Sequence, residues 1–507
     1  MRLTHALYVL AALSLGSAAS AQTPIKPGTA RVGLDSLPLS FGNPFRTAQI
    51  PSIYTTSAIF DGLTRIELDG TLQPWLATSW ESVDGVTWRF MLREGVTFSN
   101  GTPLTAGAVV TAVEYLASEE ATRESLTREM PKLKSARAID ERVVEIILAE
   151  TDTLFPRSAA ALPVAEPHEW KRLGREGFSK QPVGTGPYKV VDWQANRVVL
   201  TAHDTSWRRP KLRDLEIIAI PDSSARAQAL SAGRIDAAVG LAPEALSVIE
   251  AEGGQALRIP TAQVFGWAFM LMREGKPVTG PLADARVRRA MTMAVNRQLI
   301  VDMLLSGAAR VPSQGATPAV YGYNPDLKPL PYDPAAAKKL LAEAGYADGF
   351  AMSLMSTAAA VGADTEIHQR VAADLAEVGI RVEIRTTPMQ QYLQYLGRSS
   401  FPTDAFGMSY PADPNIDAIR PLRIHSCLRR EPFYCDERIM PKINAALTAT
   451  DEAERLKLRR DILAWYAEEA PALFIYEGVR FVGLGPKVRG FAEAHGVIAY
   501  DRIDFAD

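Results

Sequence analysis

The sequence predicts an α/β protein in which helices and strands alternate along most of the chain. Two kinds of pattern point to this class. Apolar residues recur every three or four positions in some segments, and they alternate with polar residues in others. The chain has 507 residues, enough for about three domains at roughly 150 residues each. We therefore expect mixed sheets and helices throughout, in more than one domain.

Four segments have the periodicity of amphipathic helices: 284–307, 333–345, 363–379 and 451–470. Asp333 and Pro334 supply an N-cap and a first helical residue for the second of these helices, and Gly379 ends the third. The segment 284–307 is predicted as one helix whose apolar stripe contains Val287, Met291, Ala294, Leu299 and Met303. Such stripes are typical of core-facing helix surfaces.

The N-terminal half is richer in predicted strands. Residues 87–101 indicate a strand, a turn at Glu94-Gly95 and a second short strand. Residues 186–203 predict a β-hairpin, and 212–221 an apolar strand followed by a helix and a further short strand up to Gly240. In the C-terminal half, 381–387 (RVEIRTT) alternates like a half-buried strand.

Composition and charge exclude several classes of protein. Hydrophobic residues make up 47% and charged residues 22% of the chain, the balance of a globular protein with ample core. The 55 Lys and Arg nearly balance the 58 Asp and Glu, which gives a formal net charge of -3. No large basic field is therefore expected to bind nucleic acid. Collagen-like, coiled-coil, multi-span membrane and globally disordered chains are also excluded.

The first residues predict a secretory signal peptide over 1–21. Arg2 is followed by an apolar run over 6–15, too short to span a membrane, and then by Ala19-Ser20-Ala21. Cleavage at this A-x-A site makes Gln22 the first residue of the mature chain. No cysteine lies near the cleavage site, which argues against a lipid anchor. We therefore expect a soluble protein exported to a bacterial periplasm.

Export affects how the two cysteines are interpreted, because an oxidising compartment favours disulfides. Cys427 and Cys435 lie close together in the sequence, and a bridge between them would contribute roughly 2.5 kcal/mol in the chain-entropy model. Free thiols and a metal site are the alternatives. A metal site would require a tighter C-x-x-C type of spacing and a second pair of ligands.

A series of short motifs resembles the peptide/nickel-type extracellular solute-binding proteins of ATP-binding-cassette importers, known as solute-binding protein family 5. The motifs that resemble the family occur in its order: 59–64 (IFDGLT), 74–80 (PWLATSW), 84–88 (DGVTW), 92–98 (LREGVTF), 183–188 (VGTGPY), 284–311 and 332–346. Single motifs such as GTGPY are moderately specific, whereas their shared order along nearly the whole mature chain is strongly so.

The resemblance implies a type II periplasmic-binding-protein fold with two lobes joined by a double-crossing hinge. Mapped onto this sequence, lobe I comprises 22–265 plus 478–507, and an extra subdomain is inserted near 45–185. Lobe II comprises 266–477. The segment 475–486 (IYEGVRFVGLGP) is placed where the chain would cross back over the hinge.

A secreted hydrolase is the alternative, and catalytic motifs would indicate it. The sequence contains no G-x-S-x-G elbow, no H-E-x-x-H zinc helix and no G-x-x-x-x-G-K-[ST] phosphate loop. After the signal peptide, no two histidines stand at i, i+3 or i+4, the spacing of helix-borne metal ligands. We therefore expect neither catalysis nor a cofactor or bound metal.

Two stretches match the family's cleft-lining segments by position. The first is 264–270 (VFGWAFM), in which alternation puts Phe265, Trp267 and Phe269 on one face. We predict that Phe265 and Trp267 line the ligand cleft, because aromatic side chains supply contact area in such sites. A core strand is the alternative.

The second stretch is 406–414 (FGMSYPADP), from which Met408, Ser409, Tyr410 and Asp413 are predicted to bind ligand. Peptide-binding relatives usually have a tryptophan and an aspartate here, and the aspartate holds the peptide's α-ammonium. Here the anchoring positions 407–410 contain neither. The departure predicts that simple dipeptides bind weakly, although Asp413 is close enough to serve as the anchor.

A nickel-type cargo is a further alternative, for which His425 beside Cys427 is the only indication. A surface histidine is the more common explanation for such a position. Arg423, Arg429 and Arg430 flank it and are interpreted as a solvated basic rim, with attraction of an anionic solute as the alternative.

The sequence thus predicts a monomeric periplasmic receptor that captures a small solute and passes it to the permease and ATPase subunits of an importer. A peptide-like solute, an opine, a sugar and a metal complex remain open as cargo. A sensory binding protein that signals to a membrane receptor is the second hypothesis, and the secreted hydrolase is the third.

Overall fold

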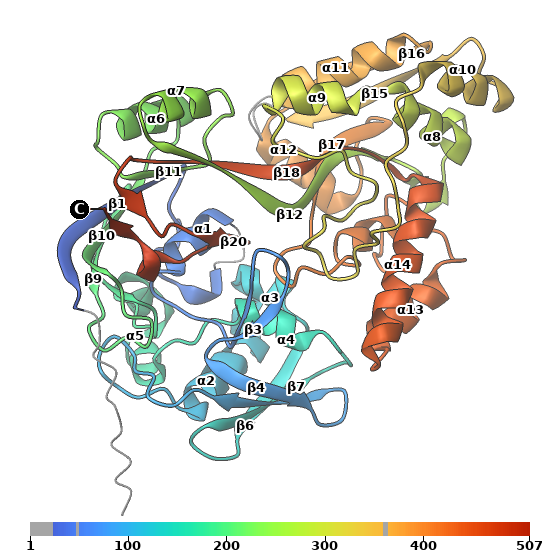
Figure 1. Cartoon of the computed structure of the whole chain (residues 1–507). Coiled ribbons are helices and arrows are strands. Elements are labelled where there is room, and N and C mark those ends of the chain that lie inside the picture. Colours follow the sequence, from blue (N-terminus) through green and yellow to red (C-terminus); the bar gives the residue numbers. More distant parts are fainter. Residues whose placement is uncertain (1–23, 47–49, 358–363, 507) are drawn as a thin grey trace, which may run out of the picture.

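The computed structural model describes residues 24–46, 50–357 and 364–506. These residues form two lobes, and two long strands run from one lobe into the other (Figure 1). The predicted signal peptide, 1–21, lies outside the described residues.

A ten-stranded mixed sheet extends through both lobes. Lobe II contributes the strands at one end of the sheet and lobe I those at the other. In sheet order the strands are β16 (Ile380–Thr387), β15 (Phe350–Thr357), β17 (Ala405–Pro411), β12 (Gln255–Phe269), β18 (Ala472–Leu484), β11 (Ala237–Val239), β1 (Lys26–Leu34), β10 (Leu212–Ala219), β9 (Arg197–Ala202) and β8 (Tyr188–Trp193).

The long antiparallel strands β12 and β18 belong to both lobes. Their pairing runs from Gln255 opposite Leu484 to Ala268 opposite Ala472, and the register shifts between Pro260 and Val264. Proline cannot donate a ladder hydrogen bond, so it is suited to such an interruption. Residues before the shift pack into the core of lobe I, and those after it into the core of lobe II.

Lobe I includes a second, four-stranded sheet with α2 packed against it, at the bottom of Figure 1. The elements of this inserted part are β2 (Thr64–Ile66), β3 (Leu72–Pro74), β4 (Ala77–Ser82), β5 (Thr87–Leu92), α2 (Ala106–Ala117), α3 (Ser125–Glu129), β6 (Leu133–Ala138), β7 (Val143–Leu148), α4 (Phe155–Ser158) and α5 (Pro167–Lys180). The rest of lobe I adds α1 (Ile50–Thr56), α6 (Ser223–Ser231), α7 (Ala245–Ala251), β19 (Val488–Arg489), β20 (Glu493–Ala494), β21 (Val497–Ile498) and β22 (Asp504–Phe505).

Lobe II is formed by its three sheet strands and the helices that cover them. The helices are α8 (Ala285–Ala294), α9 (Arg297–Leu304), α10 (Pro334–Glu343), α11 (Asp364–Ala376), α12 (Met389–Arg398), α13 (Met440–Thr448) and α14 (Glu452–Glu469), and a small hairpin pairs β13 (Met272–Arg273) with β14 (Lys276–Pro277).

Most predicted elements are confirmed. Asp333 caps α10 by accepting a hydrogen bond from the backbone N–H of Ala336 at 2.9 Å, and Gly379 ends the turn after α11 with φ +89°. The hairpin predicted over 186–203 is formed by β8 and β9.

The single helix predicted over 284–307 is wrong, because the chain forms two helices, α8 and α9. The side chain of Asn296 accepts a hydrogen bond from the backbone N–H of Leu299 at 3.0 Å and so begins a new helix. This restart changes the phase of the stripe: Met303 is 72% exposed, and Ile300 and Val301 are buried instead.

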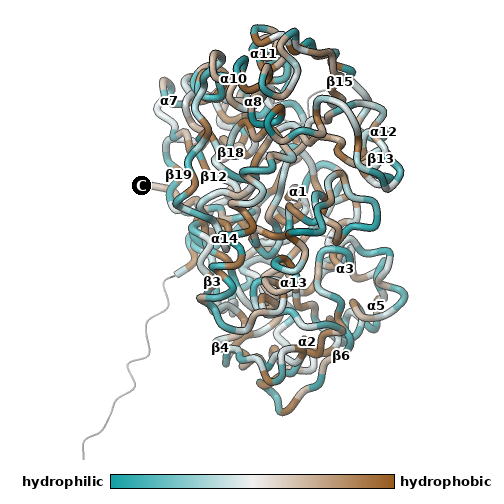
Figure 2. Tube along the Cα trace, turned by 90° about the vertical axis from the view of Figure 1, so that its right-hand side faces the viewer, coloured by the Kyte–Doolittle hydropathy of each residue, from teal (hydrophilic) through white to brown (hydrophobic). Residues whose placement is uncertain are grey.

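Hydrophobic and hydrophilic segments are interspersed along the trace, without one continuous apolar band (Figure 2). Among the described residues, none of the helices combines the length and the apolar character that crossing a membrane would require.

Candidate ligand site between the lobes

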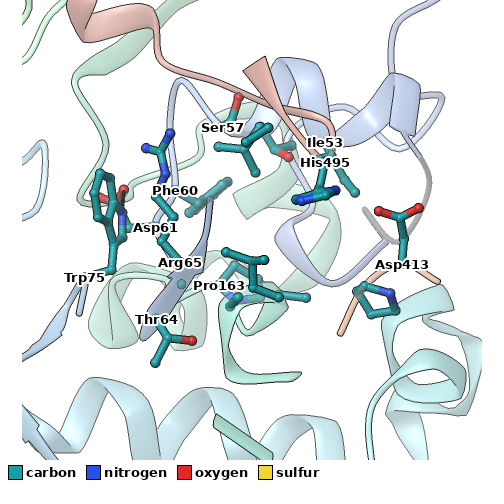
Figure 3. A pocket seen from close by; sticks show the side chains of 18 of the residues that line it. Ile53, Ser57, Phe60, Asp61, Thr64, Arg65, Trp75, Pro163, Asp413 and His495 are labelled. Carbon is teal, nitrogen blue, oxygen red and sulfur yellow. Dashed lines mark hydrogen bonds between the residues drawn. The ribbon is translucent and has the colours of Figure 1, made fainter. Parts of the chain in front are cut away.

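A cavity of about 120 Å³, which we name the inner cavity, lies where the loop after β17 approaches lobe I. Its wall in lobe I is mostly apolar and includes Ile53, Phe60, Ile66, Leu126, Pro163 and Val497. From lobe II it is bounded by Asp413 and Pro414. Figure 3 shows Asp413 and His495 at one end of this inner cavity and Trp75 and Asp61 at the other.

Asp413 and His495 form an electrostatic pair across the two lobes. Burial raises the pKa of Asp413, while His495, Arg420, Arg480 and a hydrogen bond to Gln263 act in the opposite direction. Burial lowers the pKa of His495, against the attraction of Asp413. Each group is therefore shifted toward its neutral form, which is suited to hydrogen bonding in an apolar cavity.

The contacts of His495 leave one ring nitrogen available. Its Nε2 lies 3.0 Å from the backbone carbonyl oxygen of Glu67. Because a carbonyl only accepts, this nitrogen carries the proton. The other nitrogen, Nδ1, is buried and has no hydrogen-bond partner among the described residues. In the neutral ring Nδ1 is thus an acceptor without a donor, on a residue that lines the inner cavity.

At the opposite end of the cavity, Asp61 is occupied by protein groups. It forms an ion pair with Arg208 at 2.7 Å and accepts hydrogen bonds from Trp75 Nε1 at 2.8 Å, Thr185 Oγ1 at 2.9 Å and Trp207 Nε1 at 3.2 Å. Four donors satisfy both carboxylate oxygens. Asp61 therefore organises the wall of the inner cavity and leaves Asp413 as the carboxyl group open to a solute.

Arg65 is a buried cation beside the same wall. Its guanidinium lies 4.5 Å from the centre of the Trp75 ring and pairs with Glu67 at 3.2 Å. Burial, together with the nearby Arg208 and Arg502 charges, lowers the pKa of Arg65. The Arg65 side chain lines the inner cavity, so its charge is a second orienting group for a solute.

A second cavity of about 320 Å³ lies beside the hinge strands. Phe265 of β12 and Tyr476 of β18 stack there with ring centres 4.8 Å apart and an interplanar angle of 5°. Gln263 lines this hinge cavity and hydrogen-bonds Asp413 of the inner cavity. The inner cavity and the hinge cavity are thus linked through one side chain.

The lobes meet beside the inner cavity. Arg420 of lobe II forms an ion pair with Glu129 of lobe I. Arg157 of lobe I donates hydrogen bonds to the carbonyl oxygens of Asn415 at 2.8 Å and Ile416 at 3.4 Å. These contacts hold the loop that carries Asp413 against lobe I, as in a closed form of the protein.

The structure brings some of the predicted ligand-binding residues to these cavities. Asp413 bounds the inner cavity, and Phe265 lines the hinge cavity. Met408 and Ser409 are half-buried on β17, and Ser409 pairs with Phe265 in the register of β12 and β17.

The prediction that Trp267 lines the cleft needs correction. Its side chain is fully buried in the core of lobe II, and its Nε1 donates a hydrogen bond to Nδ1 of His368 at 2.9 Å. Phe265, Trp267 and Phe269 do contact one cluster, as alternation predicts, but that cluster is the lobe II core. Near Phe265 this face opens into the hinge cavity.

Tyr410 is also a core residue rather than a cleft residue. It is 1% exposed, its hydroxyl lies 3.0 Å from Nε2 of His425, and the two rings stack. His425 is therefore not the surface residue that the sequence suggested, because it is itself buried. Burial and the nearby Arg429 charge lower the pKa of His425 to about 3. A buried neutral histidine bonded to tyrosine gives no support to a nickel ligand.

The segment after His425 is tied down locally. Cys427 and Cys435 are joined by a disulfide. Arg429 donates a hydrogen bond to the carbonyl oxygen of Leu396 at 2.7 Å, whereas Arg423 and Arg430 are exposed, as a solvated rim requires.

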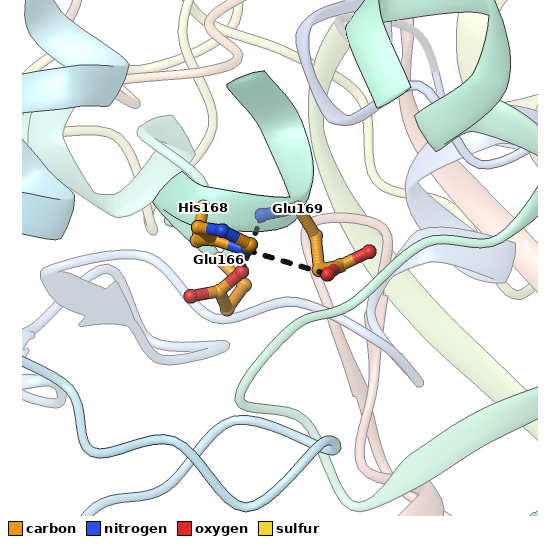
Figure 4. A group of neighbouring side chains, drawn as sticks. All are labelled: Glu166, His168 and Glu169. Atoms are coloured by element: carbon orange, nitrogen blue, oxygen red, sulfur yellow. Dashed lines mark hydrogen bonds and ion pairs between the residues drawn. The ribbon is translucent and has the colours of Figure 1, made fainter. Parts of the chain in front are cut away.

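One group of potential metal ligands occurs at the start of α5, where Glu166, His168 and Glu169 lie together (Figure 4). Glu166 caps the helix by accepting a hydrogen bond from the backbone N–H of Glu169 at 2.6 Å. Glu169 pairs with His168 at 3.5 Å and with Arg172 at 2.5 Å. Helix capping and ion pairing account for this group.

Sequence reasoning missed His495, Arg65 and Gln263. His495 and Arg65 stand in segments that carry none of the motifs sought for binding, and they reach the inner cavity from positions far apart in the chain. Gln263 lies one residue before the predicted stretch 264–270, so the position of the hinge strand was the available signal.

The chain is similar to a known protein family and to characterised proteins over most of its length. The model of the bacterial extracellular solute-binding proteins, family 5 (middle), matches residues 71–419. The chain is 25% identical over 472 residues to heme-binding protein A of Haemophilus influenzae, covering 87% of this chain and 85% of that protein. It is 27% identical over 445 residues to the glutathione-binding protein GsiB of Escherichia coli K12, with 85% of each chain covered.

Solved structures show the same fold. HbpA2 of Haemophilus parasuis superposes with a TM-score of 0.81 at 22% identity, covering 94% of this chain and 100% of that one. NikA of Brucella suis, in complex with Fe(III)-EDTA, gives a TM-score of 0.80 at 23% identity over 94% and 100% of the two chains.

Proposed function

Because the chain belongs to family 5 of the bacterial extracellular solute-binding proteins, we propose that its solute binds in the inner cavity between Asp413 and His495. Like its relatives, the protein is a solute receptor that serves an ATP-binding-cassette importer. The single observation that supports this position is that Asp413 of lobe II and His495 of lobe I line the same, mostly apolar cavity.

The geometry favours a solute with an apolar body and a polar, hydrogen-bonding head. The apolar wall of the inner cavity gains from displacing water with apolar groups. The neutral forms of Asp413 and His495 together offer a donor and an acceptor. A solute that supplies the complementary pair would contact both lobes at once and so stabilise the closed form.

The burial of Asp413 argues against a simple ammonium anchor. A carboxylate that holds an α-ammonium is best kept ionised, whereas burial raises the pKa of Asp413. Unmodified dipeptides should therefore bind weakly. A blocked peptide, an opine, a sugar or a metal complex remains a candidate. Among similar proteins, AgaA was solved with agropinic acid and DppA of Helicobacter pylori with the peptide STSA.

Calorimetry on ligand-stripped mature protein tests this proposal, with a panel of a dipeptide, its N-acetyl form, an opine, a sugar and a metal complex. For the tightest binder of the panel, Asp413→Asn and His495→Asn should each cost roughly 1–3 kcal/mol of affinity. Asparagine tolerates the backbone at residue 495, where φ is +49°. Asp348→Asn, a change at an exposed aspartate of lobe II, is the matched control and should leave affinity unchanged.

Two results would contradict the proposal. Sub-micromolar binding of the dipeptide that disappears on N-acetylation would establish an ammonium anchor. Wild-type affinity in both the Asp413 and His495 variants would remove the solute from the inner cavity.

The remaining parts of the proposal concern compartment and boundaries. We place the mature protein in the periplasm with Gln22 as its first residue, which N-terminal sequencing of exported protein checks. The lobe boundaries proposed are 22–265 plus 478–507 for lobe I, with the insertion near 45–185, and 266–477 for lobe II. Phe265, Met408 and Ser409 are proposed to line the approach to the solute. No turnover of a bound solute is expected.

A further inference from the structure

A larger cavity of about 720 Å³ lies between the lobes, lined by a different set of residues from the inner cavity. We name it the outer cavity. Lobe I contributes the hairpin 69–72, Trp80, Trp88 and residues 153–157. Lobe II contributes residues 318–325 and, from α14, Glu452, Arg455, Leu456 and Arg460. The outer cavity is thus built by both lobes, and every residue that lines it is described.

Aromatic side chains from both lobes line the outer cavity. Trp80 and Trp88 come from the insertion sheet, and Tyr321 and Tyr323 from the lobe II loop. The Trp88 indole N–H is satisfied by the backbone carbonyl of Asp152 at 3.0 Å. The Trp80 side chain is half-buried. Aromatic rings of this kind offer stacking area to a planar ligand.

Some charged groups of the outer cavity are hydrogen-bonded to the protein, and others are free to pair with a ligand. Arg157 donates its hydrogen bonds to carbonyl oxygens of Gly70, Asn415 and Ile416, and burial lowers its pKa to about 10. The carboxylate of Asp69 accepts from the backbone N–H and the hydroxyl of Thr71. These two groups hold the walls of the cavity together.

Two arginines on α14, Arg455 and Arg460, form fewer hydrogen bonds and ion pairs with the protein and can pair with a ligand. Arg455 donates to the carbonyl oxygen of Thr450 at 2.8 Å and to the hydroxyl of Tyr321 at 3.4 Å, which leaves one guanidinium nitrogen. The side chain of Arg460 is exposed and forms no ion pair within the described residues. Asp69 and Glu452 are the two carboxylates among the lining residues described, against Arg157, Arg455 and Arg460, so the lining carries a net charge of plus one. A guanidinium fork matches the geometry of a carboxylate.

We propose that the outer cavity is a second ligand site that takes a planar aromatic carboxylate. Its ring system lies against the tryptophan and tyrosine wall, and its carboxylate pairs with Arg455 and Arg460. This site uses none of the groups proposed to hold the solute in the inner cavity. The proposal for the outer cavity can therefore be tested independently of the solute of the inner cavity.

Occupation of the outer cavity should favour closure. At the cavity floor the lobes are in backbone contact, since a Cβ on Gly70 would lie 1.8 Å from the carbonyl oxygen of Ala319. A ligand can contact both walls only while the lobes are closed. Its binding free energy therefore stabilises the closed form. By linkage, the solute of the inner cavity and the ligand of the outer cavity strengthen each other's binding.

The probe for the test is 2-naphthoate, added to the full mature chain and followed by calorimetry and tryptophan fluorescence. Trp80→Ala should weaken its binding about three- to tenfold, and Arg460→Glu at least about fivefold. Arg381→Glu, at an exposed arginine of β16, is the matched charge control and should change affinity less than about twofold. Asp413→Asn should have an equally small effect, because that residue serves the inner cavity. Small-angle scattering should show a smaller radius of gyration with the probe than without it.

The outcomes separate clearly. Binding that survives both Trp80→Ala and Arg460→Glu but is lost in Asp413→Asn would place the probe in the inner cavity and overturn the proposal. Failure of folded wild-type protein to bind millimolar 2-naphthoate would overturn it as well. Because Arg460 is exposed, its variant should fold normally and decides the question even if Trp80→Ala is unstable.

Discussion

The indole Nε1 of Trp267 donates a hydrogen bond to Nδ1 of His368 at 2.9 Å, inside lobe II. This bond joins the hinge strand β12 to helix α11. The same histidine also limits the space beside the neighbouring strand β17. A Cβ on Gly407 of β17 would lie 2.8 Å from Nε2 of His368. Packing within lobe II therefore requires a glycine at residue 407. Peptide-binding relatives are expected to have larger side chains at the anchoring positions.

Trp267→Phe should destabilise the protein by about 1–3 kcal/mol, because it leaves a buried acceptor on His368 without its donor. Solute affinity should remain unchanged, since Trp267 does not line either the inner or the hinge cavity. Denaturant unfolding monitored by circular dichroism measures the first effect, with Trp193→Phe, at a half-buried tryptophan on β8, as the control. A large loss of affinity with unchanged stability would restore Trp267 to the ligand site.

His368 should make the protein less stable in mild acid. Burial lowers its pKa to about 4, from an ordinary value of 6.5. Between these two values the unfolded chain binds a proton that the folded chain does not, so stability falls as pH falls, by at most about 1.4 kcal/mol per pH unit. His368→Gln keeps an acceptor for Trp267 and should remove this contribution. The difference in unfolding free energy between variant and wild type, measured from pH 7 to pH 4.5, tests the sign.

Glu477 of β18 should have the opposite effect. Burial raises its pKa to about 7, against the attraction of Arg310. The folded chain then holds a proton that the unfolded chain has lost, so stability falls as pH rises from about 4.5 to about 7. Glu477→Gln should be more stable than wild type at pH 8, by at most about 3 kcal/mol. Equal stability of the two proteins at pH 5 and pH 8 would show that Glu477 titrates normally.

Breaking the ion pair between Arg420 and Glu129 should favour the open form. Arg420 also donates to the carbonyl oxygen of Pro411 at 3.0 Å, so Arg420→Gln loosens the loop that carries Asp413. We expect a larger radius of gyration in small-angle scattering without solute. The partner variant Glu129→Gln should act in the same direction, whereas Arg381→Gln on β16 should not. An unchanged radius in both Arg420 and Glu129 variants would mean that other contacts maintain closure.

The disulfide between Cys427 and Cys435 should be present in protein purified from the periplasm. Thiol titration of denatured, unreduced protein is then expected to find no free thiol, and two after reduction. Replacing both cysteines by serine should cost roughly 2–3 kcal/mol of stability in the chain-entropy model. Two free thiols before reduction would refute the bridge in the exported protein.

The sequence by itself determined the elements whose causes are local. Asp333 and Pro334 start α10 because capping needs only neighbouring residues. The alternation in 381–387 predicted β16, since a half-buried strand has a period of two. The ordered family motifs determined the two-lobed fold, because they extend over nearly the whole mature chain.

Only the tertiary structure decided which aromatic residues face a ligand. Alternation placed Phe265, Trp267 and Phe269 on one face, but whether that face meets a cavity or a core depends on what packs against it. His368, 101 residues away along the chain, covers Trp267, and no sequence pattern encodes that contact. Likewise Asp413 and His495 meet because two lobes close, so their pairing is a property of the assembled fold and of no local segment.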